Sequence, residues 1–137
     1  MTAENEIVRT VLAAFPATQA VYLFGSWGTE NEWLDSDVDI AVLLPPETAK
    51  KAGSLALSEL RYALERLLDR NVDLINLRQV STVFQKEIVM ADRRIFRGDR
   101  YAADEFEMLV LSFYQKLNQE RAEVLADGLR SGRFYRL

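Results

Sequence analysis

The sequence predicts an α/β fold of the α+β kind, in which a mixed β-sheet is covered by helices. Three short apolar runs have the length and composition of buried strands: Ala20–Phe24, Asp37–Leu44 and Val72–Leu77. Segments with helical spacing of apolar residues separate these runs, and strands that alternate with helices build a sheet with helices packed on it. With 137 residues, of which 49% are hydrophobic, the chain has the size of a single domain, residues 1–137, and can bury a core.

The helices before the third strand are predicted from the spacing of apolar residues. We expect the first helix at Glu6–Phe15, ended by Pro16, because apolar residues recur there on one helical face. The second helix is expected to start loosely, since Gly53-Ser54 interrupts it, and to run to Asn71, a suitable C-terminal cap. Its apolar stripe comprises Leu57, Leu60, Leu64, Leu67 and Leu68.

Two further helices and a short strand are expected after the third strand. Thr82 and Gln85 have the spacing of a capping box and would open a helix. The apolar face of that helix would carry Phe84, Ile88 and Ala91. Arg93–Arg97 is expected to form a short edge strand, and Asp99 can cap a last, long helix, from about residue 99 to Gly128. The stripe of this helix comprises Phe106, Leu109, Phe113, Leu117 and Val124.

Composition and charge narrow the function classes. The chain has 17 Lys plus Arg against 21 Asp plus Glu, a net charge of −4, which argues against a broad surface for nucleic-acid phosphates. It has no cysteine and no histidine, which excludes a disulfide framework, a thiolate or histidine metal site and a histidine general base. There is no apolar run long enough to span a membrane, and the polar start lacks the pattern of a signal peptide. We therefore expect a cytoplasmic protein.

Asp37 and Asp39 stand at the start of the second predicted strand. Alternate side chains of a strand point to the same face, so both carboxylates would project together. Neighbouring carboxylates repel each other unless a cation lies between them. Mg²⁺ takes oxygen ligands and is commonly held by one or two carboxylates together with substrate phosphates. The pair therefore predicts a magnesium site.

The first predicted strand ends at Gly25-Ser26. Glycine allows the backbone to come close to a ligand. If a short helix begins after Ser26, its free amides and the positive end of its dipole face an anion. We therefore expect a phosphate cradle beside the acidic pair.

The spacing of these two features resembles a known signature. Gly25-Ser26, ten further residues and then Asp37-Val38-Asp39 is similar to the motif of the DNA polymerase β-type nucleotidyltransferase superfamily. That superfamily places a third carboxylate on a later strand, and Asp73, inside the apolar run Val72–Leu77, is the matching position. The resemblance covers roughly residues 20 to 98 and implies the polymerase β-type nucleotidyltransferase fold.

The resemblance also implies a reaction and a set of site residues. The α-phosphate of a nucleoside triphosphate would be attacked and pyrophosphate released. Two metal ions roughly 3.5–4 Å apart can stabilise both the attacking and the leaving oxygen. Asp37 and Asp39 would bridge two Mg²⁺ ions, and Asp73 would bind the ion beside the nucleophile. The residues that would hold the β- and γ-phosphates are Gly25, Ser26 and Trp27.

A chain of this length resembles the minimal nucleotidyltransferases, or MNT proteins, which are commonly paired with a HEPN-domain toxin. The resemblance implies an antitoxin that transfers AMP from ATP to a hydroxyl, above all a tyrosine, of a cognate HEPN ribonuclease. The implied partners are the HEPN toxin and ATP, without direct nucleic-acid or membrane contact. Two alternatives stay open: a small-molecule nucleotidyltransferase of the aminoglycoside type, for which 137 residues leave little room, and a non-catalytic antitoxin that acts by binding alone.

Several residues near the motif have structural as well as functional interpretations. Trp27 and Trp33 are expected to pack against the protein rather than to stack on a base, and Asp35 is expected to be a loop acid. Arginine binds phosphates and carboxylates in a planar, two-point manner. An arginine cluster near the end of the third helix is therefore either a solvated edge or a contact for nucleotide or partner. It comprises Arg93, Arg94, Arg97 and Arg100.

One position departs from the pattern of the minimal nucleotidyltransferases. In that family a glycine usually follows the helix after the third strand, whereas this chain has Ala91-Asp92 there. The departure concerns the local turn and leaves the acidic residues unaffected.

Overall fold

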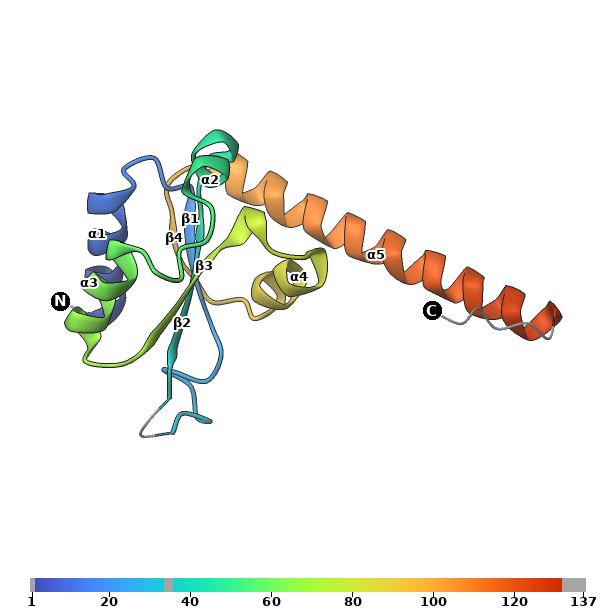
Figure 1. The fold of residues 1–137 in the computed structure, drawn as a ribbon, viewed down its shortest axis with the longest axis horizontal. Coiled ribbons are helices and arrows are strands. Elements are labelled where there is room, and N and C mark those ends of the chain that lie inside the picture. Colours follow the sequence, from blue (N-terminus) through green and yellow to red (C-terminus); the bar gives the residue numbers. More distant parts are fainter. Residues whose placement is uncertain (1, 34–35, 132–137) are drawn as a thin grey trace.

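A mixed β-sheet forms the centre of the molecule. The computed structural model describes residues 2–33 and 36–131, and within these ranges the chain forms a four-stranded sheet with helices on both faces (Figure 1). The strands are β1 (Ala20–Phe24), β2 (Val38–Leu43), β3 (Val72–Asn76) and β4 (Arg94–Arg97), in the order β3-β2-β1-β4. β1 is antiparallel to β2 and β4, while β2 is parallel to β3. The predicted mixed sheet and its edge strand β4 are thereby confirmed.

Helices cover the two faces of the sheet and bury two apolar clusters. The helices are α1 (Ala3–Ala14), α2 (Pro46–Ala52), α3 (Glu59–Leu68), α4 (Thr82–Met90) and α5 (Arg100–Ser131), and a 3₁₀ turn (Leu77–Gln79) follows β3. In Figure 1, α1 and α3 lie on one side of the sheet and α4 and α5 on the other. The helix residues buried on the first side include Ile7, Val11, Leu60 and Leu64, and those on the second include Ile88, Ala103, Phe106 and Val110. Within the described ranges, no helix is long and apolar enough to cross a membrane.

The first helix begins earlier than its apolar spacing predicts. The side chain of Thr2 accepts a hydrogen bond from the amide of Asn5 at 3.1 Å and so caps α1 one residue before Ala3. The helix ends at Ala14, before Pro16, as expected. The cap, rather than the first apolar residue, sets the start.

The single helix predicted before the third strand is wrong, because the chain forms two helices there. Gly53 ends α2 with a φ of 60°, a backbone conformation that favours glycine. Ser58 then caps α3, since its side chain accepts from the amide of Arg61 at 3.2 Å. Leu57 lies before this cap and its side chain is 79% exposed, so it does not belong to the buried stripe.

Two helices end at an aspartate in the left-handed conformation. Asp69, with a φ of 52°, is the C-terminal cap of α3, so the predicted cap at Asn71 is wrong. After α4, Asp92 adopts a φ of 56°. Asp tolerates this conformation better than most residues with a side chain. Asp92 thus supplies the turn at the place where the resemblance implied a glycine, while Ala91 is exposed rather than part of the apolar face.

The start of α4 also differs from the predicted capping box. Ser81, not Thr82, is the N-terminal cap, because its hydroxyl accepts from the amide of Phe84 at 3.2 Å. The Gln85 side chain reaches back to the carbonyl of Leu77 at 2.9 Å instead of closing the box. This bond ties α4 to the end of the sheet.

The long α5 begins as predicted and extends away from the sheet. Asp99 caps it by accepting from the amide of Ala102 at 3.0 Å. The helix continues past Gly128 to Ser131, so the predicted stop is wrong. Only its first turns pack on the sheet, and the rest projects from the body (Figure 1). The predicted stripe is therefore wrong at Leu109, Phe113 and Val124, which are exposed. Its other member beyond Phe106, Leu117, is half-buried.

Candidate active site

The three predicted acids lie at one end of the sheet. Asp37 immediately precedes β2, and Asp39 is the second residue of that strand, so the alternation of the strand directs both toward the same face. Asp73 is the second residue of β3 and stands opposite Asp39 in the parallel register. The fold thus brings together the acids that the sequence pattern singled out.

Among these three acids, Asp39 is the one whose ionised form is destabilised by its surroundings. Burial raises the pKa of its carboxyl to about 6, and the negative charges of Asp73 and then of Asp37 add to the shift. An ionised carboxylate is disfavoured both by loss of water and by neighbouring charges of the same sign. A cation bound between these oxygens would relieve both effects.

Gly25 lies directly against Asp39. The last residue of β1, Phe24, pairs with Asp39 across the antiparallel ladder, and Gly25 follows it with a φ of 75°. A Cβ atom on Gly25 would lie 1.9 Å from Oδ2 of Asp39, which no side chain can tolerate without displacing the carboxylate. Gly25 is therefore required by the position of Asp39 as well as by the left-handed backbone.

The segment after Gly25, residues 27–33, was expected to be a short helix or a turn, and its described residues form a tight turn, so the helix on which the phosphate cradle was conditional does not form there. The carbonyl of Ser26 accepts from the amide of Thr29 at 3.0 Å, which closes a turn. The Ser26 hydroxyl lies 3.1 Å from the Ser36 hydroxyl, so the loop is linked to the residue that precedes Asp37. Among the described residues, the amides of Ser26 and Trp27 have no acceptor, which leaves two adjacent donors for an anion.

The two tryptophans of this loop differ in environment. Trp27 is half-buried and packs against the apolar cluster under α1 and α3, as predicted. Trp33 is 76% exposed, so the packing predicted for it is wrong. Asp35, predicted as a loop acid, lies outside the described residues.

Arg93, the residue before β4, holds the Gly25–Trp27 turn, a role that the sequence pattern did not reveal. Its guanidinium donates to the carbonyl of Gly25 at 3.0 Å and to that of Trp27 at 2.5 Å. The Arg93 carbonyl accepts from the amide of Leu23 at 2.9 Å, which fixes the residue against β1. A Cβ atom on Gly28 would lie 3.1 Å from this guanidinium, so the second glycine of the loop leaves room for it.

Other arginines of the cluster are engaged by α5. Arg94 donates to the carboxylate of Glu107 and lies 3.4 Å from that of Asp104. Arg97 lies 3.7 Å from Asp104. Arg100 lines a hollow on α5. The cluster is therefore divided between the Gly25–Trp27 turn and the base of the long helix.

The carboxylate oxygens of Asp37, Asp39 and Asp73 are ligands of the kind that Mg²⁺ prefers. Within the described ranges, no three acidic side chains are arranged to hold a metal ion by themselves. Mg²⁺ seldom requires that, since it keeps water ligands and is usually bound by one or two carboxylates and by substrate phosphates. The raised pKa of Asp39, caused by burial and by Asp73 and Asp37, shows unbalanced negative charge at this point.

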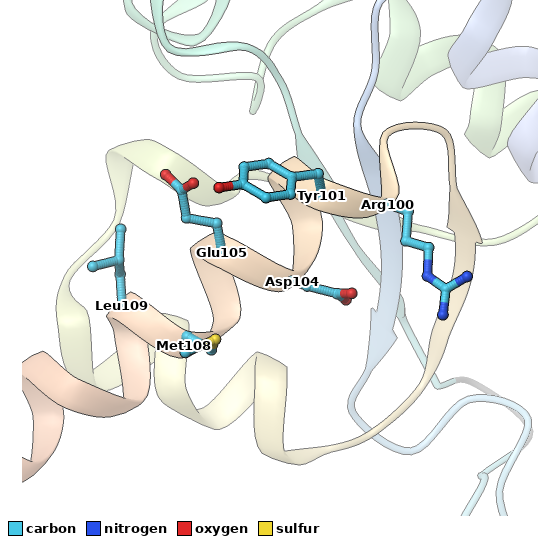
Figure 2. A pocket seen from close by; sticks show the side chains of 6 residues that line it. All are labelled: Arg100, Tyr101, Asp104, Glu105, Met108 and Leu109. Carbon is cyan, nitrogen blue, oxygen red and sulfur yellow. The ribbon is translucent and has the colours of Figure 1, made fainter.

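Two hollows adjoin different parts of the molecule. One of about 480 Å³ is lined by Asp37 and Asp73 and by residues that precede α3. The other, of about 530 Å³, lies along the first turns of α5 and is bordered by Tyr101, Glu105 and Met108 (Figure 2). The first hollow shares its walls with the candidate acids, while the second belongs to α5 alone.

A mixed sheet with paired aspartates at the start of one strand, a third on the parallel neighbour and a Gly-Ser turn beside them is the arrangement of a nucleotidyltransferase. Residues 6–101 match the family described as Polymerase beta, Nucleotidyltransferase, and the chain belongs to this family. Over 124 residues it is 34% identical to the protein adenylyltransferase MntA of Shewanella oneidensis, a match that covers 90% of this chain and 86% of that protein.

Solved structures of toxin–antitoxin complexes are also similar to this chain. A chain of the MntA–HepT complex is 30% identical with a TM-score of 0.65, and the match covers 93% of this chain and 97% of that one. A toxin–antitoxin structure with AMP-PNP gives 32% identity and a TM-score of 0.72, covering 92% and 98%. A tri-AMPylated Shewanella oneidensis HEPN toxin in complex with an MNT antitoxin gives 30% and 0.65, covering 93% and 96%.

Proposed function

We propose that this chain is an antitoxin that transfers AMP from ATP to a hydroxyl of a HEPN-domain toxin in the cytoplasm and thereby inactivates it. The observation that carries the proposal is the alignment of Asp39 with Asp73 across β2 and β3, beside the turn at Gly25. The 34% identity to a protein adenylyltransferase supports a protein as the acceptor. Residues 1–137 would act as one nucleotidyltransferase domain.

Each site residue has a part in this reaction. The hydroxyl oxygen of the acceptor attacks the α-phosphorus of ATP, the bond from that phosphorus to the β-phosphate oxygen breaks, and pyrophosphate leaves. The hydroxyl proton passes to a carboxylate oxygen of Asp73. The amides of Ser26 and Trp27, with the Ser26 hydroxyl, hold the β- and γ-phosphates, as expected for donors directed at an anion. Arg93 keeps this turn in place.

Magnesium would be held by Asp37, Asp39 and Asp73 together with the phosphates of ATP. When bound, it supplies positive charge at the oxygens that gain negative charge in the transition state. The raised pKa of Asp39, caused by burial and by the neighbouring acids, supports a cation requirement.

The exposed face of α5 is the proposed docking surface for the toxin. Tyr101 and Met108 are 79% and 71% exposed, and both border the hollow on this helix (Figure 2). Exposed apolar residues gathered on one face mark sites of protein contact. The helix projects from the sheet, so a partner can contact it without covering the acids (Figure 1).

The two alternative functions predict different products. An aminoglycoside-type enzyme would adenylylate a small molecule and leave the toxin unchanged. A non-catalytic antitoxin would neutralise the toxin without ATP, but such a protein has no use for three aspartates at one end of the sheet, where their charges are unfavourable.

The test is intact-mass spectrometry of a cognate HEPN toxin after incubation with this protein, ATP and Mg²⁺. We expect the toxin to gain the mass of one or more AMP units, and the Asp37→Ala, Asp39→Ala double variant to produce no gain. Circular dichroism controls for the fold of the variant. Neutralisation without a mass change, and equally by the double variant, would favour binding alone. A small-molecule product with an unmodified toxin would favour the aminoglycoside-type enzyme.

A further inference from the structure

Asp37 is the one candidate acid that the sheet itself does not hold. It immediately precedes β2 and is exposed. The pairing of β2 with β1 reaches only to Asp39, and its pairing with β3 reaches only to Val38. A side chain that binds a metal ion must keep a fixed orientation, and its supporting contacts provide it. The orientation of Asp37 therefore depends on what holds the main chain on either side of it.

Both peptide groups that flank Asp37 are bonded to the segment between α3 and β3. The guanidinium of Arg70 donates to the carbonyl of Ser36 at 3.2 Å, on the N-terminal side of Asp37. The amide of Val38 donates to the carbonyl of Asn71 at 2.9 Å, on its C-terminal side. The two bonds together set the direction in which the carboxylate of Asp37 projects. The first of them comes from a side chain, so a substitution can remove it without altering the main chain.

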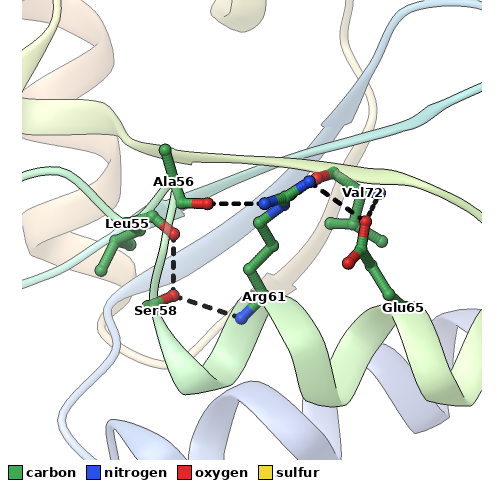
Figure 3. A network of polar contacts seen from close by, with 6 residues as sticks. All are labelled: Leu55, Ala56, Ser58, Arg61, Glu65 and Val72. Carbon is green, nitrogen blue, oxygen red and sulfur yellow. Dashed lines mark hydrogen bonds and ion pairs between the residues drawn. The ribbon is translucent and has the colours of Figure 1, made fainter.

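The segment that supplies these bonds is itself held by α3 (Figure 3). The Arg61 guanidinium donates to the carbonyl of Val72 at 2.9 Å and pairs with Glu65 at 3.3 Å. Glu65 also accepts from the amide of Val72 at 3.0 Å. On the other side, Asp69 ends α3 in the left-handed conformation directly before Arg70. Arg70 therefore lies between a fixed helix end and a fixed start of β3, which makes it a firm support.

Ser36 also connects Asp37 to the loop that follows β1. Its hydroxyl accepts from the amide of Trp33 at 2.7 Å and lies 3.1 Å from the hydroxyl of Ser26. The same residue thus meets Arg70 through its carbonyl and the Gly25–Trp27 turn through its side chain. A displacement of Ser36 would therefore change the position of Asp37 relative to this turn.

We propose that Arg70 is a positioning residue of the magnesium site and that it acts on Asp37 through the carbonyl of Ser36. This inference rests on the proposed function, in which Asp37 binds Mg²⁺ together with the phosphates of ATP. The charge of Arg70 has the opposite effect on the metal, because a cation near the acids repels Mg²⁺. Loss of the positioning bond weakens Mg²⁺ binding, whereas loss of the charge alone strengthens it. The sign of the change in the Mg²⁺ requirement therefore separates the two roles.

The experiment compares Arg70→Ala with Arg66→Ala in AMP transfer to the HEPN toxin at saturating ATP and varied free Mg²⁺. Arg66 is exposed in the last turn of α3, so its removal takes away the same charge four positions earlier. We expect Arg70→Ala to raise the half-saturating Mg²⁺ concentration on the order of tenfold, the loss typical for a residue that orients a metal ligand. Arg66→Ala should behave like the wild type. Arg70→Lys, which keeps the charge and one donor, should lie between Arg70→Ala and the wild type. A lowered Mg²⁺ requirement in Arg70→Ala, or equal changes in both alanine variants, would overturn the proposal.

A second measurement uses the protein without metal, nucleotide or toxin. Amide hydrogen exchange followed by NMR should be several times faster at Val38 in Arg70→Ala, and unchanged at Ala41 in the middle of β2, because only the main chain around Asp37 is released. Equal acceleration at both amides would show a general loss of stability and overturn the positioning role. Unchanged exchange at Val38 with a raised KM for ATP would make Arg70 a nucleotide contact instead. Failure of the wild type to label the toxin would overturn the proposed function, and it is seen separately because the exchange comparison needs no transfer.

Discussion

At the scale of single residues, the site is built around one unfavourable charge. Asp39 lies against Gly25 on one side and stands opposite Asp73 on the other. Burial and the two neighbouring acids raise the pKa of its carboxyl from 3.8 to about 6. Without a cation, ionisation of Asp39 therefore lowers the stability of the folded protein relative to the unfolded chain, in which the same group ionises at its usual pKa.

We expect Asp39→Asn to make the metal-free protein more stable at pH 8. The folded pKa lies above the unfolded one, so the folded state binds more protons between about pH 4 and pH 6, and stability falls as the pH rises through this window. Asparagine does not ionise, so the variant does not lose this stability as the pH rises. Thermal unfolding in EDTA should show a higher Tm for the variant at pH 8 and a smaller difference at pH 4.

The exposed Asp92→Asn provides the control for this measurement, since it removes one carboxylate without touching the row of acids. It should leave the pH dependence of the wild type in place. Added Mg²⁺ should raise the Tm of the wild type more than that of Asp39→Asn. A variant no more stable than the wild type at pH 8 would show that Asp39 is not strained.

At the scale of elements, the acids could be predicted from sequence and the contacts that support them could not. The side-chain period of a strand is local, so the projection of Asp37 and Asp39 to one face follows from the sequence pattern. Asp73 was matched only through the resemblance to the nucleotidyltransferase superfamily. Arg93 acts on Gly25, 68 positions away, because β4 pairs with β1. Apolar periodicity predicted neither this pairing nor that α5 would leave the sheet.

The end of a helix was predicted correctly where the sequence offers one capping residue. It was predicted wrongly where two residues near the end of the helix can both act as the cap. Asp99 caps α5 as expected. At α4, Ser81 and Thr82 are both residue types that cap helices, and it is the Ser81 hydroxyl that accepts from the amide of Phe84. At the end of α3, Asp69 takes the left-handed conformation before Asn71 is reached.

Arg93 is expected to support ATP binding through its contact with the Gly25–Trp27 turn. Removing its two bonds to the carbonyls of Gly25 and Trp27 should leave the turn poorly ordered. We expect Arg93→Ala to raise the KM for ATP on the order of tenfold, since a charge-assisted hydrogen bond contributes about 1.5–3 kcal/mol when well formed. The measurement is steady-state AMP transfer at varied ATP. The fold should persist, because Arg93 precedes the strand and does not belong to the core.

Arg97→Ala is the matched control for Arg93→Ala, since Arg97 lies in the same segment but pairs with Asp104 on α5 at 3.7 Å. It should not change the KM for ATP. Arg93→Lys can supply only part of the two-point contact and should fall between the wild type and Arg93→Ala. An unchanged KM in Arg93→Ala would remove the residue from the nucleotide site.

At the scale of the whole molecule, the base of α5 is fixed and the rest of the helix is the proposed docking surface. The Tyr22 hydroxyl donates to Glu107 at 2.8 Å, and Arg94 bonds the same carboxylate, so β1 and β4 both hold the helix. Burial, with the bond to Glu107, raises the pKa of Tyr22 and keeps it a neutral donor. A docked toxin would thus be held at a defined position relative to the acids.

Because α5 projects away from the acids, we expect a substitution on this helix to weaken binding of the toxin without changing the affinity for ATP. Met108 is 71% exposed on α5 and borders its hollow, and Met90 is 60% exposed at the end of α4 outside that hollow. We expect Met108→Asp to weaken toxin binding on the order of tenfold, because a charge replaces an apolar contact, while calorimetric affinity for ATP with Mg²⁺ stays unchanged. Met90→Asp should bind the toxin like the wild type, and AMP transfer by Met108→Asp should recover at high toxin concentration. If Met108→Asp captures the toxin as tightly as the wild type, the partner docks elsewhere and the projecting helix serves another purpose.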